Sequence, residues 1–373
     1  MPTAASGDLA PVYWKLGPAD PHYGAACVLI PWYLYLYYGD RRVLEENSGM
    51  MTRWLAWLAQ FEDKGLMTLE RFADWCPSLN VCSMDNTPVF FVSTWFYYYA
   101  LSVTAKIADV LGEQSAARTF SAHAARVKTA YICAFVREDG VAVGLYEEYM
   151  TKIRKAKAVG PEIAASIEGT LKDMCSSRSQ TPFALALVLR LLPENKVDTV
   201  TRQLLRSVIE INSYHLNTGS LGTKYLFEAL SQTGHSDVAC KVLTQTSYPS
   251  YGYMLREGAT TIWERWERLE NVSMNSHNHS QMCDFDSWLY KSLAGIRADE
   301  TQPGFRHIVL APEIVKDLRY VRAEVDTVQG TVKSGLALSE TGLEVKVFIP
   351  ANCTAELRLP AALFVRPSLL LDG

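Results

Sequence analysis

"TWFYYYALSVTAKIADVLGEQSAARTFSAHAARVKTAYICAFV", residues 94–136, contains two helical patterns separated by one glycine. In the first pattern, apolar residues recur with the helical period up to Gly112. Glycine suits the position after a helix end because it adopts a positive φ readily. The second pattern begins at Glu113 and continues through Val136. Two helices joined by so short a turn pack antiparallel, so this stretch predicts a helical hairpin.

The same arrangement recurs along most of the chain. Further helices are predicted at 23–40, 41–62, 181–193, 194–211, 221–234, 235–245 and 287–297. No strand pattern lies between them, which favours an array of αα-hairpins over alternating strands and helices. Near residue 300 the pattern changes to β-rich segments with short turns, so a β domain is expected at 301–373. We expect an extended segment at 1–23 and a helical domain at 24–300, with a basic surface insertion at about 145–175.

Composition excludes several classes of function. The 373 residues carry a net charge of −4 without a basic domain, so nucleic acid is not an expected partner. The sequence contains no run of 18 apolar residues, so no membrane span is predicted. The N-terminus lacks the features of a signal peptide. The 8 cysteines are scattered, as is typical of free thiols, and we expect a cytoplasmic protein. Aromatic residues make up 11% of the chain, which suits a core and also a sugar site.

Glu264 is the first candidate for chemistry, since it lies between Trp263 and Trp266. Aromatic walls reduce the hydration of a carboxylate and prepare it to act as an acid or a base. Thr261 and Glu264 also match the T-x-x-E capping box that opens a helix. The two interpretations are compatible.

A polar stretch follows at 275–286, and two other segments carry candidates. His277 and His279 with nearby Cys283, Asp284 and Asp286 allow a metal-dependent hydrolase, but the spacing matches no metal motif. A polar lining for a hydroxyl-rich ligand, or a loop of satisfied polar groups, fits the amides and imidazoles better. Upstream, Asp74 and Trp75 repeat the pairing of an acid with an indole, and Gln180 is interpreted as a helix cap. No phosphate loop, nucleophile elbow or cofactor motif occurs, so neither a metal nor a cofactor is expected.

Several strings together resemble one family. "YPSYGYMLREGATTIWERWE", "SMNSHNHS" and "WLYKSLAGI" resemble the C-terminal half of the α-L-rhamnosidases, and "ADWCP", "HLNTGSLGTKYLFEALSQTGHSDVA" and "PGFRHIVLAP" continue the likeness. The resemblance covers nearly the whole chain. It implies a mainly α fold, an (α/α)6 six-hairpin barrel that is incomplete at its N-terminus, followed by a C-terminal β-sandwich.

The resemblance also implies an activity and assigns residues to it. Such enzymes are inverting glycoside hydrolases that release terminal L-rhamnose from glycosides, and they use two carboxylates. Glu264 matches the general base. His279 matches a residue that lines the sugar subsite, and Asn278, Trp263, Trp266, Asp74 and Trp75 are expected to contribute to substrate binding.

The chain departs from the family pattern in one important respect. The general acid of the family belongs to a D-E-R-x-G-W-T-G-D motif, and no such string occurs in this sequence. Ala25 and Ser280 also stand where the family carries Asp and Tyr. We therefore expect residues outside this chain to supply the acid. We also expect the chain either to form oligomers or to associate with the missing N-terminal part. The alternative is a non-catalytic, carbohydrate-binding remnant.

Overall fold

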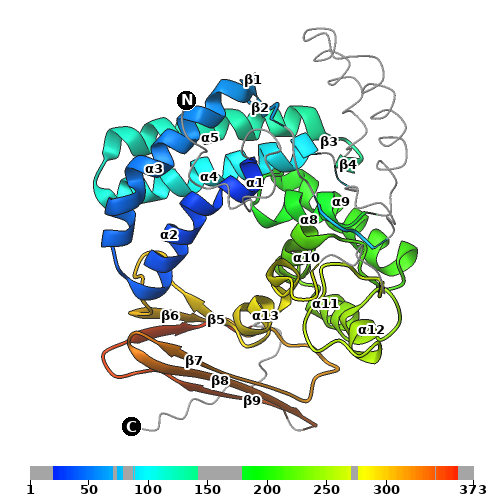
Figure 1. Cartoon of the computed structure of the whole chain (residues 1–373). Coiled ribbons are helices and arrows are strands. Elements are labelled where there is room, and N and C mark those ends of the chain that lie inside the picture. Colours follow the sequence, from blue (N-terminus) through cyan, green and yellow to red (C-terminus); the bar gives the residue numbers. More distant parts are fainter. Residues whose placement is uncertain are drawn as a thin grey trace, which may run out of the picture. The chain divides into compact units, whose positions relative to one another are not determined.

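The structure is a computed structural model, and it describes residues 20–69, 74–78, 87, 89–141, 179–269, 276–340 and 342–359. The chain divides into two compact units, Met1–Tyr33 with Arg41–Phe285 and Leu34–Asp40 with Asp286–Gly373. The first is mainly helical and the second contains the larger sheets (Figure 1). The expected insertion at 145–175 and residues 1–19 of the expected extended segment lie outside the described residues.

The chain enters the first unit through a helical turn. Residues 21–23 were expected to be extended, but they form α1 (Pro21–Gly24). The carboxylate of Asp20 accepts hydrogen bonds from the backbone N–H groups of His22 at 2.8 Å and Tyr23 at 3.0 Å. Asp20 therefore caps this turn, and Pro21 at its first position favours the helical φ.

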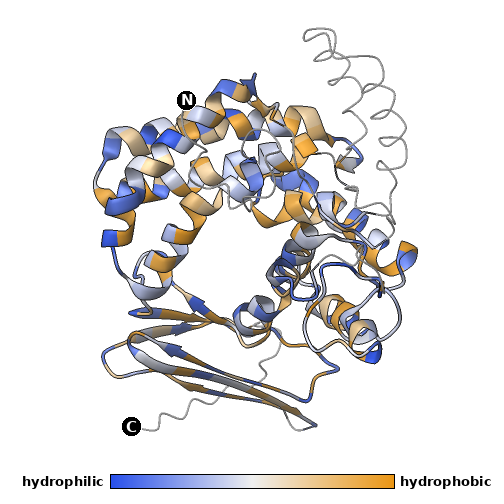
Figure 2. Ribbon diagram, in the orientation of Figure 1, coloured by the Kyte–Doolittle hydropathy of each residue, from blue (hydrophilic) through white to orange (hydrophobic). Residues whose placement is uncertain are grey.

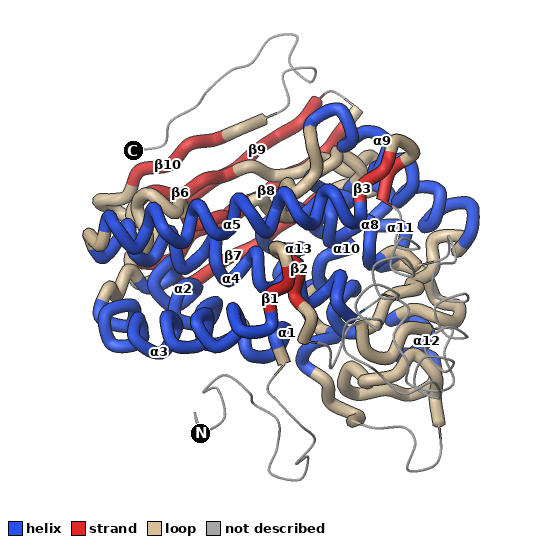
Figure 3. The backbone as a smooth tube through the Cα atoms, turned by 90° about the horizontal axis from the view of Figure 1, so that it is seen from above, coloured by secondary structure: helices blue, strands red, loops and turns tan. Residues whose placement is uncertain are grey.

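The quoted stretch forms the predicted hairpin. It contains α4 (Val89–Leu111) and α5 (Gln114–Phe135), which lie side by side (Figures 1 and 3). Gly112 between them has a φ of 82°, the left-handed conformation expected of it. Two further helices, α2 (Ala26–Tyr38) and α3 (Arg42–Leu58), precede this hairpin, and α3 packs against α4.

The other predicted helices of the first unit are also present. They are α8 (Thr181–Val188), α9 (Glu194–Leu205), α10 (Ser220–Gln232) and α11 (Ser236–Leu243), with a shorter α12 (Tyr251–Arg256) that was not predicted. All eight residues of α8 are buried, and Figure 2 shows the hydrophobic colour of this helix. α8 packs against both α9 and α10, so it forms the centre of this group.

Two short ladders interrupt the helical pattern. β1 (Glu62–Asp63) pairs with β2 (Leu66–Met67), and β3 (Val136–Arg137) pairs with β4 (Gly140–Val141). Gly65 lies in the first turn and Gly140 is the first residue of β4, and their φ values are 89° and 123°. Each strand has two residues, which is too short for the alternating pattern that predicts strands.

The second unit begins with the end of a helical segment and continues as strands. α13 (Phe285–Trp288) starts in the first unit and is followed by the π-helical turn η6 (Leu289–Leu293). Strand structure then begins at Ile296, ahead of the expected change near residue 300, because Gly295 with a φ of 72° ends the helix. No helix in the described part of the chain is long and apolar enough to cross a membrane.

Two three-stranded sheets make up the rest of the second unit (Figure 1). One has the order β10-β6-β5 and contains β5 (Ile296–Ala298), β6 (His307–Leu310) and β10 (Thr354–Leu357), with β10 parallel to β6. The other is an antiparallel meander of β7 (Tyr320–Thr327), β8 (Gly330–Ser339) and β9 (Gly342–Phe348). Ile296, Ile308 and Leu310 of the first sheet share a core with Val332 of the second, as in a β-sandwich.

Candidate active site

Glu264 lies in a segment without a regular helix. Residues 259–269 form bends between α12 and η5 (Ser280–Met282), so the capping-box interpretation of Thr261 and Glu264 is wrong. The Thr261 hydroxyl donates instead to the carbonyl of His277. Backbone hydrogen bonds join this segment to the following one, from Glu264 N to Ser276 O at 3.0 Å and from His279 N to Ile262 O at 2.9 Å. These bonds satisfy backbone groups that a helix would otherwise have satisfied.

The carboxylate of Glu264 is held by hydrogen bonds to both of its oxygens. The indole Nε1 of Trp75 donates to Oε1 at 2.7 Å, and the backbone N–H of Ser276 donates to Oε2 at 2.8 Å. Nδ1 of His279 lies 3.8 Å from Oε2. The Glu264 side chain is 14% exposed, so it is enclosed but still reaches the surface. An enclosed, oriented and accessible carboxylate can activate a water molecule or bind a hydroxyl group.

Asp74 does not line a surface but anchors the segment that carries Trp75. Its carboxylate has no exposed surface and accepts hydrogen bonds from Gly219 N at 2.8 Å and Gly222 N at 2.7 Å, and from the hydroxyl of Thr181. Both amides belong to the N-terminus of α10, so Asp74 caps a helix far from it in sequence. Burial raises the pKa of Asp74 above its ordinary value, while the bonds from Gly219, Thr181 and Gly222 oppose that rise.

The two glycines of "TGSLGT" make this anchor possible. A Cβ on Gly219 would lie 2.2 Å from the backbone oxygen of Trp75, and one on Gly222 would lie 2.0 Å from Oγ1 of Thr181. Larger residues would therefore push the Asp74–Trp75 segment away from α10. The spacing of these two glycines is visible in the sequence, but it does not show that they approach Asp74 and Trp75.

Of the two tryptophans beside Glu264, Trp266 cannot contact a ligand in this structure. It has no exposed surface, and its Nε1 donates to the carbonyl of Thr218 at 2.8 Å. In this structure both Trp266 and Asp74 are buried and hydrogen-bonded within the protein, and their expected contact with substrate stays a prediction. Trp263 is 5% exposed, and its ring lies 6.2 Å from the ring of His277.

His279 and Asn278 are accessible neighbours of the carboxylate. Nε2 of His279 is buried and has no hydrogen-bond partner among the described residues. A buried polar atom without a partner is uncommon in proteins, and a ligand could bond to Nε2 only if neighbouring side chains moved to expose it. Asn278 is exposed, and its backbone is held by Ser276, whose hydroxyl donates to Asn278 O at 2.9 Å. The structure thus brings Glu264, His279 and Trp75 together, and Asn278 precedes His279 in the chain.

The remaining candidates have other roles. Asp284 is paired with Lys224 at 3.3 Å, and the described residues contain no group of three acidic, His or Cys side chains that could hold a metal ion. The side chain of Gln180 does not cap α8. It bridges instead to the chain before α10, donating to His215 O at 2.8 Å and accepting from Asn217 N at 3.0 Å. Ser276 was not singled out from the sequence, because a backbone N–H leaves no sequence signal.

Helical hairpins that hold a carboxylate beside indole and imidazole groups, followed by a β-sandwich, are the architecture expected of a helical-hairpin glycosidase. Residues 2–293 match the bacterial alpha-L-rhamnosidase six-hairpin glycosidase domain, and residues 295–363 match the bacterial alpha-L-rhamnosidase C-terminal domain. The chain therefore belongs to the bacterial α-L-rhamnosidase family. The resemblance and the fold class predicted from the sequence are confirmed.

Known proteins extend this likeness over nearly the whole chain. An alpha-L-rhamnosidase of Formosa agariphila is 31% identical over 92% of this chain and 34% of its own length. The structure of alpha-L-rhamnosidase from Dictyoglumus thermophilum is 34% identical, with a TM-score of 0.82 over 95% of this chain and 36% of that one. The Streptomyces avermitilis alpha-L-rhamnosidase complexed with L-rhamnose is 28% identical, with a TM-score of 0.75 over 91% and 29%. The chain thus spans about a third of the length of these relatives.

Proposed function

We propose that this chain contributes the general-base half of an inverting α-L-rhamnosidase, with Glu264 as the base. The bonds from Trp75 and Ser276 to its two oxygens carry the proposal, because they orient the carboxylate without removing it from the surface. His279 and Asn278 would bind hydroxyl groups of a terminal L-rhamnose. Relatives named as alpha-L-rhamnosidases support this substrate class.

The reaction needs a second carboxyl group on the opposite side of the glycosidic bond. In inverting enzymes the two groups are about 6.5–9.5 Å apart, which leaves room for the attacking water. The acid motif of the family does not occur in this sequence. We infer that the acid comes from the part of the barrel that the longer relatives contain, either on the same polypeptide or on an associated one.

A fusion tests the proposal directly. The chain alone should hydrolyse an aryl α-L-rhamnoside slowly or not at all. Fusing it to the preceding region of the Formosa agariphila relative should restore turnover, and Glu264→Gln in the fusion should lower kcat by about 10²–10⁴-fold. NMR of the first product formed should show the β-anomer. Robust turnover by the isolated chain that Glu264→Gln abolishes would show that the acid is within it.

A non-catalytic rhamnoside-binding remnant is the second candidate, favoured by the missing acid motif. It would keep the oriented carboxylate and the free imidazole atom but no acid. Calorimetry with L-rhamnose distinguishes the two functions. Binding that His279→Ala weakens, with no turnover even in the fusion, would support the remnant over the enzyme.

A further inference from the structure

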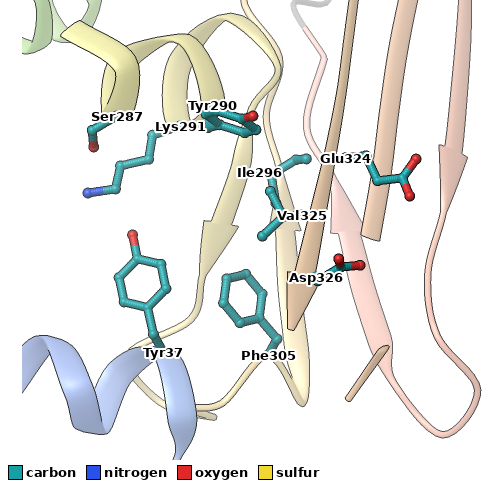
Figure 4. A pocket seen from close by; sticks show the side chains of 9 residues that line it. All are labelled: Tyr37, Ser287, Tyr290, Lys291, Ile296, Phe305, Glu324, Val325 and Asp326. Carbon is teal, nitrogen blue, oxygen red and sulfur yellow. The ribbon is translucent and has the colours of Figure 1, made fainter. Parts of the chain in front are cut away.

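A second cavity lies entirely within the second unit and shares no residue with the site around Glu264. Its volume is about 360 Å³, and it lies among the end of α2, the α13–η6 segment, β5 and β7 (Figure 4). This volume is within the range of small-molecule sites, which is about 300–1,000 Å³.

Aromatic rings form one wall of this cavity. The rings of Tyr37 and Phe305 are 5.6 Å apart, with an angle of 59° between their planes, and Tyr290 is 39% exposed. Ile296 and Val325 line the cavity beside Phe305 (Figure 4). Phe305 is 3% exposed and lies behind this wall, so Tyr37 and Tyr290 supply the aromatic surface that would pack against the C–H groups of a sugar ring.

Polar groups gather at one end of the same space. Figure 4 shows the hydroxyl groups of Tyr37 and Ser287 and the amine of Lys291 directed toward one region of the cavity. The Lys291 amine lies 5.8 Å from the centre of the Tyr37 ring. An amine donates, and two hydroxyl groups both donate and accept, so these groups suit a ligand that carries several hydroxyls.

The edge of β7 supplies further hydrogen-bonding groups. β7 pairs with β8 on one side, and no other strand of the described chain pairs with its second side. The carboxylates of Glu324 and Asp326 point away from Tyr37 and Lys291 in Figure 4. They are bonded elsewhere, to Lys333 at 2.9 Å and to the Thr331 hydroxyl at 2.8 Å. Residues of this edge line the cavity, and an unpaired strand edge presents N–H and C=O groups that can form hydrogen bonds.

From the aromatic wall, the converging polar groups and the open strand edge, we propose that this cavity is a second, non-catalytic binding site for a pyranose sugar. It goes beyond the proposed function, because none of its residues takes part in the site around Glu264. A pyranose can be neutral or a uronate, and both share the ring and hydroxyl chemistry recognised here. A second sugar site would hold a branched or polymeric glycan while its end is processed elsewhere.

Calorimetric or NMR titration of the full chain tests the proposal, with L-rhamnose, D-galactose and D-glucuronate as probes. The Glu264→Gln/His279→Ala double variant removes the contribution of the other site. In that background Tyr290→Ala and Lys291→Met should each weaken binding of a probe by about 3- to 10-fold. Tyr320→Ala is the matched control, because Tyr320 is exposed on β7 outside the cavity.

The outcomes decide the proposal separately from the proposed function. Probe binding in the double variant that falls with Tyr290→Ala but not with Tyr320→Ala supports the second site, and the preferred probe shows whether the sugar is neutral or acidic. The proposal is overturned if no probe binds the double variant. It is also overturned if neither Tyr290→Ala nor Lys291→Met changes the affinity for the probe. Hydrolysis by the fusion depends on Glu264, so failure of that assay leaves this test intact.

Discussion

At the scale of single residues, the site depends on one indole N–H. Trp75 Nε1 reaches Glu264 Oε1 at 2.7 Å across 189 residues of sequence. A hydrogen bond to a charged group contributes more than one between neutral groups, because the charge strengthens the electrostatic attraction. Loss of this bond should therefore change the position of the carboxylate more than it lowers the stability of the fold.

Trp75→Phe tests this contact. The change keeps a ring and removes the N–H, so turnover by the fusion should fall about 10-fold, with little change in melting temperature. Trp95→Phe is the control, since Trp95 also loses an N–H bond, the one to the carbonyl of Leu185 at 2.7 Å. It should lower the melting temperature without lowering kcat. Full activity in Trp75→Phe would mean that the bond does not position the base.

At the scale of elements, packing around helix and strand ends matters most. α10 begins against the Asp74–Trp75 segment, and side-chain hydrogen bonds join the β1–β2 ladder to α4 and α5. Both contacts join segments that are distant in sequence, and each can be changed at a single position.

Glycine replacements should have opposite effects at two positions. Gly219→Ala would place a Cβ 2.2 Å from the Trp75 carbonyl, so the free energy of unfolding should fall by about 2 kcal/mol or more. Gly49→Ala lies in the exposed interior of α3, where its Cβ would meet only the end of the Arg53 side chain at 3.4 Å. It should raise the free energy of unfolding by about 0.5–1 kcal/mol. Urea denaturation followed by circular dichroism measures both free energies of unfolding. Equal changes in the two variants would contradict the close contact between Gly219 and the Trp75 carbonyl.

The β1–β2 ladder should respond to pH. Burial opposes ionisation of Glu62, but His123, Tyr97 and Arg126 lower the pKa of this carboxyl below 4.5. A lowered pKa in the folded state means that the ionised form stabilises the fold above pH 4.5, and that this stability is lost as the pH falls through the folded value. Glu62→Gln should lower the melting temperature at pH 7, and the difference should shrink toward pH 3.

Glu45→Gln is the control for this change. Glu45 forms an exposed pair with Arg41 at 3.0 Å, in which both side chains are 52% exposed. Exposed pairs contribute little, about 0–1 kcal/mol. A pH dependence in Glu62→Gln no larger than that in Glu45→Gln would show that the buried contacts of Glu62 do not stabilise the ladder.

At the scale of the whole molecule, one helix exposes an apolar stripe. Ile30, Leu34 and Tyr38 of α2 follow one another at intervals of four residues and are 52%, 41% and 61% exposed. Residues four apart lie on the same helix face, so these three form a continuous strip. Apolar strips of this kind favour association with another surface.

We expect this stripe to make the isolated chain self-associate. Ile30→Glu/Leu34→Glu should lower the apparent mass in light scattering, because charges oppose burial of the strip. Leu255→Glu is the control, since Leu255 is 71% exposed but lies on α12. A wild-type chain that stays monomeric at high concentration would contradict the expectation.

Local periodicity was sufficient to predict most helices and the change to strands, because each pattern is contained in about twenty residues. Prediction from local patterns failed where contacts with residues distant in the sequence decide the local structure. Thr261 and Glu264 match a capping box, but backbone bonds to 276–279 keep the segment out of a helix. The two-residue ladders and α12 were too short to produce a pattern.

The amino-acid pattern was sufficient to predict that paired helices precede a strand-rich unit, and that Glu264 lies beside tryptophans in a family-specific string. The folded chain was needed to find which groups hold that carboxylate, and that Asp74 caps α10 and Trp266 is buried. It also decided that Tyr37 and Tyr290 border one cavity. This difference arises because the apolar period of a helix depends on residues close together in the chain, whereas the hydrogen bonds of Asp74 join residues up to 148 positions apart.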